Sequence, residues 1–317
     1  MGEKLVVVES TARLHFGIVN PFSRERRRFI SVGLAVDAPR TRVVVEHHDK
    51  LNVVGCRAVE VYERIQRLIR RYGPLKGLVR IEECIPEHVG LGSTTQLLLA
   101  AATGLLTYNS IDFDVIEVAR LMGLGRVSGV GTYAFMYGGF IVDTGVYEER
   151  DFPKLLLRLD FPEEWAFILI TPRGRGLDEA SEQTAFTTAP AVPQELPWKA
   201  AFVLFTRLIP AIIERNFEEF ALALSDLQRT VGEMFSSLQG GIYSPWSTKY
   251  IELLLNMGVK GVGQSSWGPT VYGVVESLDE ALEVAEKIKG LVDETTTIRV
   301  CRARNKGATV RVLTRST

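Results

Sequence analysis

The sequence predicts an α+β protein with two domains, and three observations support this fold class. With 317 residues, of which 46% are hydrophobic and 24% charged, the chain can bury a full core and divide into two domains. In the first half, strand-like segments precede a glycine-rich loop and helical segments follow it. In the second half, strands and helices alternate in an order that suits a sheet with helices on one face.

Apolar and β-branched runs mark the strands of the first half, and apolar residues at helical spacing mark its helices. Strands are predicted at residues 5–9, 41–46, 78–82 and 137–143, and helices at 58–71, at 96–106 and in a segment that runs through residue 121. Asp112 is the predicted N-cap of the last of these helices. Proline punctuation near residues 152–153 and 161–162 indicates the domain boundary, so the predicted domains are residues 1–160 and 161–317.

The second half follows the same rules. Strands are predicted at residues 165–171 and 271–275 and near 298 and 310, and helices at 198–215, 217–238, 248–257 and 279–288. A glycine-rich segment at 261–270 directly precedes the strand at 271–275.

The chain is organised around residues 86–96, PEHVGLGSTTQ, where a glycine loop runs directly into a helix. The glycines allow backbone conformations that a Cβ would block, and three hydroxyl residues join the free amides of the first helical turn. Such a helix start favours an anion, although an ordinary capped helix would explain the same residues. Neither the Walker nor the Rossmann spacing is present. The predicted phosphate-binding residues are Gly90, Leu91, Gly92, Ser93, Thr94 and Thr95.

Composition excludes several classes of function. A net charge of -1 argues against nucleic acid or an anionic membrane as a partner. No apolar run reaches the roughly 18 residues of a spanning helix, and the N-terminus lacks a signal-peptide core, so a cytoplasmic protein is expected. Cys56, Cys84 and Cys301 are odd in number and far apart, which predicts buried thiols rather than a disulfide or a metal site.

Four stretches occur in a fixed order along the chain. They are the strand ending at Ala12-Arg13, the loop at 86–96, the segment from Ser128-Gly129 to the Tyr-Gly-Gly-Phe at 137–140, and the glycine-rich loop before a C-terminal strand. Together they resemble the GHMP kinase superfamily, whose phosphate loop reads Pro-x-x-x-Gly-Leu-Gly-Ser-Ser. The resemblance implies an N-terminal domain like that of a ribosomal protein and a ferredoxin-like C-terminal domain.

Five runs resemble one branch of that superfamily, the β-ribofuranosylaminobenzene 5′-phosphate synthases of methanopterin biosynthesis. They are RLHF at 13–16, HVGLGS at 88–93, SGVG at 128–131, GGFIVD at 138–143 and GQSSWGPTVYG at 263–273. The branch implies condensation of phosphoribosyl pyrophosphate with 4-aminobenzoate or 4-hydroxybenzoate, with release of CO₂ and pyrophosphate. It also implies Mg²⁺ as cofactor, with unknown protein ligands, and a homodimer. The expected partners are thus small-molecule substrates.

Departures from the kinase pattern agree with this branch. Many superfamily kinases carry Ser-Gly-x-Asp with the Asp as base, but here the fourth position is Gly131, and Arg120 stands where a Mg²⁺-binding Glu is expected. Two alternatives stay open. One is an ATP-dependent small-molecule kinase that uses the same loop for triphosphate, and the other is a non-catalytic ligand-binding protein.

The implied chemistry assigns roles to particular side chains. Arg13 or Arg126 would hold the carboxylate or the ribose 5-phosphate, because a guanidinium binds either group bidentately. His15 would donate to a phosphate, Ser93 would stabilise the leaving pyrophosphate, and Trp267 would stack on the aromatic acid. The catalytic candidates are Arg13, His15, Ser93 and Gln264, and the further substrate contacts are Ser128, Gly129, Ser265, Ser266 and Trp267.

Overall fold

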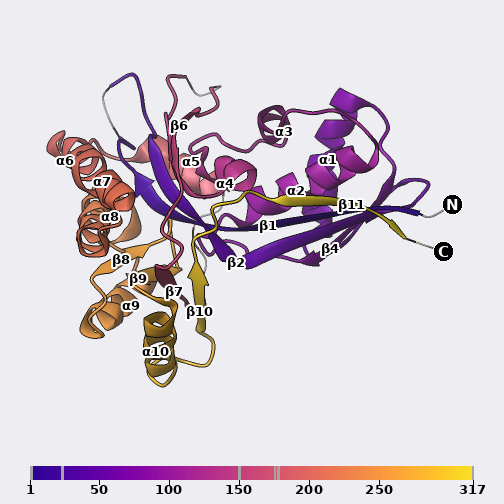
Figure 1. The fold of residues 1–317 in the computed structure, drawn as a ribbon. Helices are drawn as coiled ribbons and strands as arrows, with labels where there is room; N and C mark the ends of the chain where they lie inside the picture. The colour runs from indigo at the N-terminus through magenta and orange to yellow at the C-terminus, as the bar shows by residue number, and fades with distance from the viewer. Residues whose placement is uncertain (1–2, 23–24, 149–150, 175, 177–178, 316–317) are drawn as a thin grey trace.

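The computed structural model describes residues 3–22, 25–148, 151–174, 176 and 179–315. The described residues form two sheets with helices packed around them (Figure 1). The larger sheet contains β1 (Glu3–Ile18), β2 (Ser31–Glu46), β3 (Leu51–Gly55), β4 (Gly77–Glu83), β5 (Phe140–Asp143), β6 (Leu155–Leu159) and β11 (Thr309–Arg315). The smaller sheet contains β7 (Ala166–Thr171), β8 (Gly261–Gln264), β9 (Val271–Val275) and β10 (Thr297–Arg302).

The larger sheet is built on a long antiparallel hairpin of β1 and β2, and its strand order is β11-β1-β2-β4-β3. Strand β11 returns from the end of the chain to pair with β1, from Glu3 opposite Arg315 to Glu9 opposite Thr309 (Figure 1). The predicted domain boundary at residue 160 stays a prediction. Strand β11 follows that boundary in the sequence but lies in the larger sheet, beside β1.

Helices cover one face of the larger sheet (Figure 1). They are α1 (Ala58–Tyr72), α2 (Ser93–Tyr108), α3 (Val115–Leu121) and α4 (Val130–Tyr137). The prediction of Asp112 as the N-cap of α3 is wrong, because the Asp114 carboxylate accepts a hydrogen bond from the Glu117 amide at 2.7 Å. Helix α4 was not predicted, because its sequence continues a glycine-rich segment. Helix α2 is almost wholly buried against β1 and β2, which fixes the position of its N-terminus.

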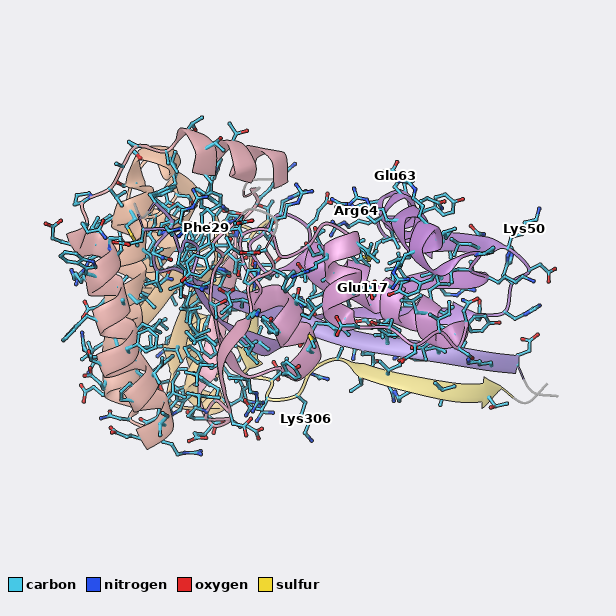
Figure 2. The ribbon with its side chains drawn as sticks, turned by 90° about the horizontal axis from the view of Figure 1, so that it is seen from above. Phe29, Lys50, Glu63, Arg64, Glu117 and Lys306 are labelled. Atoms are coloured by element: carbon cyan, nitrogen blue, oxygen red, sulfur yellow. A yellow bond between two sulfur atoms is a disulfide. The ribbon has the colours of Figure 1, made fainter. Side chains whose placement is uncertain are left out.

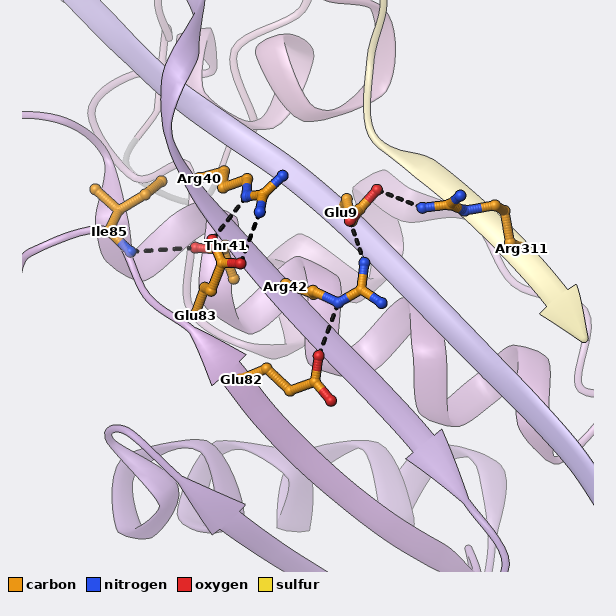
Figure 3. Close-up of polar contacts among 8 residues, drawn as sticks. All are labelled: Glu9, Arg40, Thr41, Arg42, Glu82, Glu83, Ile85 and Arg311. Carbon is orange, nitrogen blue, oxygen red and sulfur yellow. Dashed lines mark hydrogen bonds and ion pairs between the residues drawn. The ribbon is translucent and has the colours of Figure 1, made fainter. Parts of the chain in front are cut away.

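The opposite face of this sheet carries charged side chains that pair across the strands. Figure 3 shows Arg42 between Glu9 and Glu82, with Arg311 on the far side of Glu9. These ion pairs are partly exposed, so each contributes only about 0 to 1 kcal/mol, and they mark a solvent-facing surface.

The smaller sheet has order β10-β7-β9-β8 and is packed between two groups of helices. The helices of this half are α5 (Glu179–Thr188), α6 (Glu195–Val203), the π-helical turn η1 (Leu204–Leu208), α7 (Ile209–Glu214), α8 (Phe217–Gln239), α9 (Pro245–Asn256) and α10 (Leu278–Lys289). The continuous stretch Glu195–Glu214 is long and apolar enough to cross a membrane by length and composition alone. It packs on α8, as the core helix of a folded domain does.

A disulfide joins Cys56 to Cys84, so the prediction of separate thiols is wrong for these two residues. Strands β3 and β4 run parallel with Gly55 opposite Ile81, which brings the two cysteines to the same end of the sheet. Sequence spacing does not reveal this pairing. Cys301 is buried with a free thiol, as predicted.

Candidate active site

Two glycine-rich loops from opposite halves of the chain meet at one place. The hydroxyl of Ser265 donates a hydrogen bond to the carbonyl oxygen of Gly90 at 2.6 Å. The amide of Ser266 donates to the carbonyl oxygen of His15 at 3.3 Å, which ties strand β1 to the same point. A Cβ on Gly90 would lie 2.1 Å from the carbonyl oxygen of Ser265, so the contact requires glycine.

A cavity of about 580 Å³ opens where the loops meet. The first half of the chain contributes mainly polar and cationic walls, from Arg13, His15, Arg57, Ser93, Arg126 and Ser128. The second half contributes mainly apolar walls, from Val231, Phe235, Ile242, Tyr243 and Trp267. The cavity can therefore hold a ligand that is anionic on one side and aromatic on the other.

The predicted phosphate loop forms the floor of the cavity at the start of α2. Gly92 is the N-cap in a left-handed conformation, with φ 77° and no side-chain cap. The first hydrogen bond of the helix runs from the Gln96 amide to the Gly92 carbonyl oxygen, at 3.1 Å. The amides of residues 93–95 therefore have no acceptor within the helix. Ser93, Thr94 and Thr95 line the cavity with their hydroxyls.

The prediction that Leu91 binds phosphate is not what the structure shows for its side chain. Its side chain is 3% exposed, packs in the hydrophobic core and does not line the cavity. The residue therefore anchors the loop, and only its backbone could meet a ligand.

Arg57 is a cavity residue that no motif identifies. Its guanidinium donates to the hydroxyl of Thr94 at 2.7 Å and to that of Ser93 at 3.3 Å. It also forms ion pairs with Glu60 at 2.7 Å and with Glu87 at 3.5 Å. Arg57 is held here because it is the N-cap of α1, one residue after the disulfide at Cys56. A cation therefore lies directly on the phosphate loop.

Arg13 supports the loop from the other side. Its guanidinium donates to the Gly90 carbonyl oxygen at 2.5 Å, and its amide donates to that of Leu91 at 3.2 Å. The side chain passes so close to Gly92 that a Cβ there would lie 3.1 Å from Arg13 Cγ. Arg13 thus positions the loop and also faces the cavity.

His15 begins a chain of polar groups that leads into the protein. Its Nε2 lies 3.2 Å from the hydroxyl of Ser128, which lies 3.4 Å from Asp143 Oδ2. Burial and the nearby charge of Arg13 lower the pKa of His15 well below its usual value, so the imidazole is neutral at neutral pH. A neutral imidazole adds no positive charge for a phosphate, but it can exchange a proton.

Asp143 ends this chain inside the core. Its carboxylate accepts hydrogen bonds from the amides of Gly129 at 2.7 Å, Gly145 at 2.9 Å and Ser31 at 3.0 Å. Burial nevertheless raises the pKa of Asp143 to about 7. Gly129 was predicted to contact the substrate. It is buried and does not line the cavity, and its amide donates to Asp143 instead.

The loop at 264–268 is mostly engaged in internal hydrogen bonds. The Gln264 side chain accepts from the Ser244 amide at 2.8 Å and donates to the Ser266 carbonyl oxygen at 2.9 Å. Ser265 is fully buried and lies outside the cavity wall, so a direct substrate contact by its side chain is not what the geometry shows. Gln264 and Ser266 do face the cavity.

Trp267 lies among aromatic side chains on the apolar side of the cavity. Its ring packs edge-on against Phe235 with centroids 5.0 Å apart and against Phe186 with centroids 6.0 Å apart. Phe235, Tyr243 and Trp267 all line the cavity, which provides surfaces for a planar ring.

Within the described part of the chain, no three His, Cys, Asp or Glu side chains come together as metal ligands. Glu60 is the one carboxylate among the described residues of the cavity wall. A cation bound in this cavity could use Glu60 together with substrate phosphates.

Comparison with known proteins shows whole-length similarity. The chain is 28% identical over 330 residues to the β-ribofuranosylphenol 5′-phosphate synthase of Methanothermobacter thermautotrophicus, covering 96% of this chain and 98% of that protein. It is 26% identical to the protein of the same name from Archaeoglobus fulgidus, covering 96% and 99%. The phosphomevalonate kinase of Streptococcus pneumoniae shares the fold with a TM-score of 0.70 and 10% identity, covering 95% and 99%.

Two family descriptions match the chain on either side of the cavity. The GHMP kinases N terminal domain matches residues 57–139, which contain Arg57 and the phosphate loop. The GHMP kinases C terminal domain matches residues 208–293, which contain α8 and the loop at 264–268. The chain therefore belongs to the GHMP kinase superfamily.

Proposed function

We propose that this protein is a β-ribofuranosylphenol (or -aminobenzene) 5′-phosphate synthase. It would join phosphoribosyl pyrophosphate to 4-hydroxybenzoate or 4-aminobenzoate and release pyrophosphate and CO₂. The names of the archaeal relatives specify a phenol product, which favours 4-hydroxybenzoate. The observation that carries the proposal is a cavity in which the phosphate loop, with Arg57 bonded to it, faces aromatic side chains.

The proposed reaction begins with the departure of pyrophosphate. The bond between ribose C1 and the pyrophosphate oxygen breaks, its electron pair leaves with the pyrophosphate, and C1 acquires oxocarbenium character. The amides of residues 93–95 and the guanidinium of Arg57 are preorganised donors for that developing charge. Removing such a donor typically slows an enzyme by about 10²- to 10³-fold.

Carbon–carbon bond formation would follow. The ring carbon that bears the carboxylate supplies a π-electron pair to C1, and the resulting adduct loses CO₂. The electron pair of the broken carboxyl bond restores the aromatic ring, so the protein needs no base at this step. Gly131, which stands where many superfamily kinases carry a catalytic Asp, is compatible with that chemistry.

Mg²⁺ is expected to accompany the diphosphate. This ion commonly binds through one or two carboxylates together with phosphate oxygens, and Glu60 would be the protein ligand. When bound, it would neutralise part of the charge on the leaving group.

The test is to incubate the purified protein with phosphoribosyl pyrophosphate and each aromatic acid, without ATP, and to measure CO₂ and pyrophosphate. The proposal predicts both products in equal amounts. ATP consumption that depends on an alcohol, with no CO₂ from either acid, would instead identify a kinase. Tight binding of the substrates without turnover would identify a ligand-binding protein.

Two substitutions test the predicted site. Ser93→Ala removes the hydroxyl that accepts from Arg57, and Gln264→Ala removes the brace of the second loop. Each is expected to lower turnover by about tenfold or more, because a hydrogen bond to a charged or buried group is worth about 1 to 3 kcal/mol. Ser237→Ala, on the exposed side of α8, is the matched control. Wild-type rates in both site variants would remove this assignment.

We also expect a cytoplasmic homodimer, on the basis of the family resemblance. Light scattering of the purified protein would show twice the monomer mass of 35.3 kDa, and a monomer mass would contradict the expectation.

A further inference from the structure

Three arginine side chains converge beside the cavity, away from the contacts of the phosphate loop. A Cβ built on Gly123 would lie 2.9 Å from Arg64 Nη1, 2.9 Å from Arg67 Nη1 and 3.7 Å from Arg126 Nη2. All three terminal nitrogens thus surround one point, at a glycine whose φ of +79° and missing side chain leave room for them. Gly123, Arg64 and Arg126 also line the cavity.

Two helix-to-loop contacts hold this arrangement together. Arg64 and Arg67 are one turn apart on α1, and Arg64 donates to the carbonyl oxygen of Met122 at 2.7 Å. Figure 2 shows Arg64 on the side of α1 that faces the other half of the molecule. Arg126 follows three residues after Gly123 in the loop that leads to Ser128.

The charge balance differs from that at the phosphate loop. Arg57 is paired with two carboxylates there. Among the residues that the structure describes, neither Arg67 nor Arg126 forms an ion pair or a hydrogen bond. The charges of Arg67 and Arg126 therefore lie beside that of Arg64 with no carboxylate pairing either of them among the described residues, and an anion bound between them would relieve their mutual repulsion.

We infer that Arg64, Arg67 and Arg126 form a second anion subsite, which takes the phosphomonoester of a sugar phosphate. A phosphomonoester carries close to two charges and three acceptor oxygens, which suits several guanidinium groups. This inference rests on the proposed function, in which the substrate carries a diphosphate at one end of the ribose and a monophosphate at the other. The diphosphate then occupies the loop with Arg57, and the 5-phosphate occupies the arginine subsite.

The test measures binding rather than turnover, so its result does not depend on whether the proposed reaction is correct. Ribose 5-phosphate and inorganic pyrophosphate are titrated separately into the wild-type protein and into Arg67→Gln, Arg126→Gln and Arg57→Gln by calorimetry. Arg67→Gln and Arg126→Gln are expected to weaken ribose 5-phosphate by about tenfold each and to leave pyrophosphate unchanged. Arg57→Gln is expected to do the reverse.

The matched control is Arg70→Gln, which removes an exposed arginine from the same helix one turn further from this cluster. The inference is overturned if ribose 5-phosphate binds all variants equally or if Arg70→Gln weakens it as much. It is also overturned if Arg67→Gln and Arg126→Gln weaken pyrophosphate instead, because the cluster would then extend the diphosphate site. A protein that binds ribose 5-phosphate as predicted but releases no CO₂ would keep the subsite and lose the proposed reaction.

Discussion

Replacing Gly90 with alanine would force the two loops of the cavity apart. The new Cβ would lie 2.1 Å from the carbonyl oxygen of Ser265 and 3.2 Å from that of Gly268. Carbon and oxygen atoms rarely come closer than about 3.3 Å, so one loop must move by about 1 Å. Both obstructing atoms belong to the backbone, and a change of side-chain rotamer cannot relieve the clash.

The expected magnitudes follow from this geometry. The φ of +82° at Gly90 costs an alanine about 1 to 2 kcal/mol, and overpacking adds about 1 to 3 kcal/mol to the loss of unfolding free energy. A displacement of about 1 Å at the site should lower kcat/KM by about 10²-fold. Urea denaturation measures the first effect, and release of CO₂ from carboxyl-labelled 4-hydroxybenzoate measures the second.

Gly73→Ala is the matched control for the backbone effect. Gly73 has nearly the same φ, +85°, but a Cβ there would have no atom within 4 Å. It should lose about 1 to 2 kcal/mol of stability and keep its activity. Wild-type activity in Gly90→Ala would refute the reasoning, and so would an equal loss of activity in Gly73→Ala.

Three further predictions concern the surroundings of the loop. Arg57→Gln should raise the KM for phosphoribosyl pyrophosphate by about tenfold or more, measured by initial rates, because two donors to the loop hydroxyls are lost. Reduction of the disulfide between Cys56 and Cys84, which are 28 positions apart in the sequence, should lower the free energy of unfolding by about 3 to 4 kcal/mol, measured in urea. His15→Gln should flatten the decline of stability below pH 6.5, because the imidazole of the unfolded chain gains a proton there while the buried His15, with its lowered pKa, stays neutral.

Each of these has a control and a contrary result. The control Arg57→Lys keeps the positive charge but lacks the planar guanidinium group. A wild-type KM in both Arg57→Gln and Arg57→Lys would exclude a role for Arg57 in binding phosphoribosyl pyrophosphate. The reducing agent should not affect Cys56→Ser, and an equal loss of stability there would point to another cause. For His15, identical pH profiles of urea midpoints in variant and wild type would contradict the buried neutral imidazole.

Much of the fold could be predicted from the sequence because local patterns determine it. Alternating β-branched residues marked β1, β2 and β4, and the apolar run after Ser93 marked the buried helix α2. The glycines at 90 and 92 were informative because a left-handed backbone leaves few other choices. The choice of Ser93 and Gln264 as candidates for one active site came from the family resemblance rather than from any local signal.

The remaining features depend on tertiary contacts that sequence spacing does not show. Arg57 reaches the phosphate loop only because α1 begins beside it, and Cys84 reaches Cys56 only because β3 and β4 are parallel. Burial decides that Leu91 and Ser265 anchor loops rather than contact a ligand. The convergence of arginines at Gly123 likewise joins a helix to a loop more than fifty residues away, as the bond from Arg64 to Met122 shows.

The central claim is that the cavity unites a diphosphate site with an aromatic site for carbon–carbon bond formation. The most direct measurement is ¹³C NMR of the product formed from phosphoribosyl pyrophosphate and 4-hydroxybenzoate labelled at the ring carbon that bears the carboxylate. One-bond coupling between that carbon and ribose C1, in a product that has lost the carboxyl group, is the predicted result. A product that keeps the carboxylate and joins ribose through oxygen, or no product at all, would contradict the account.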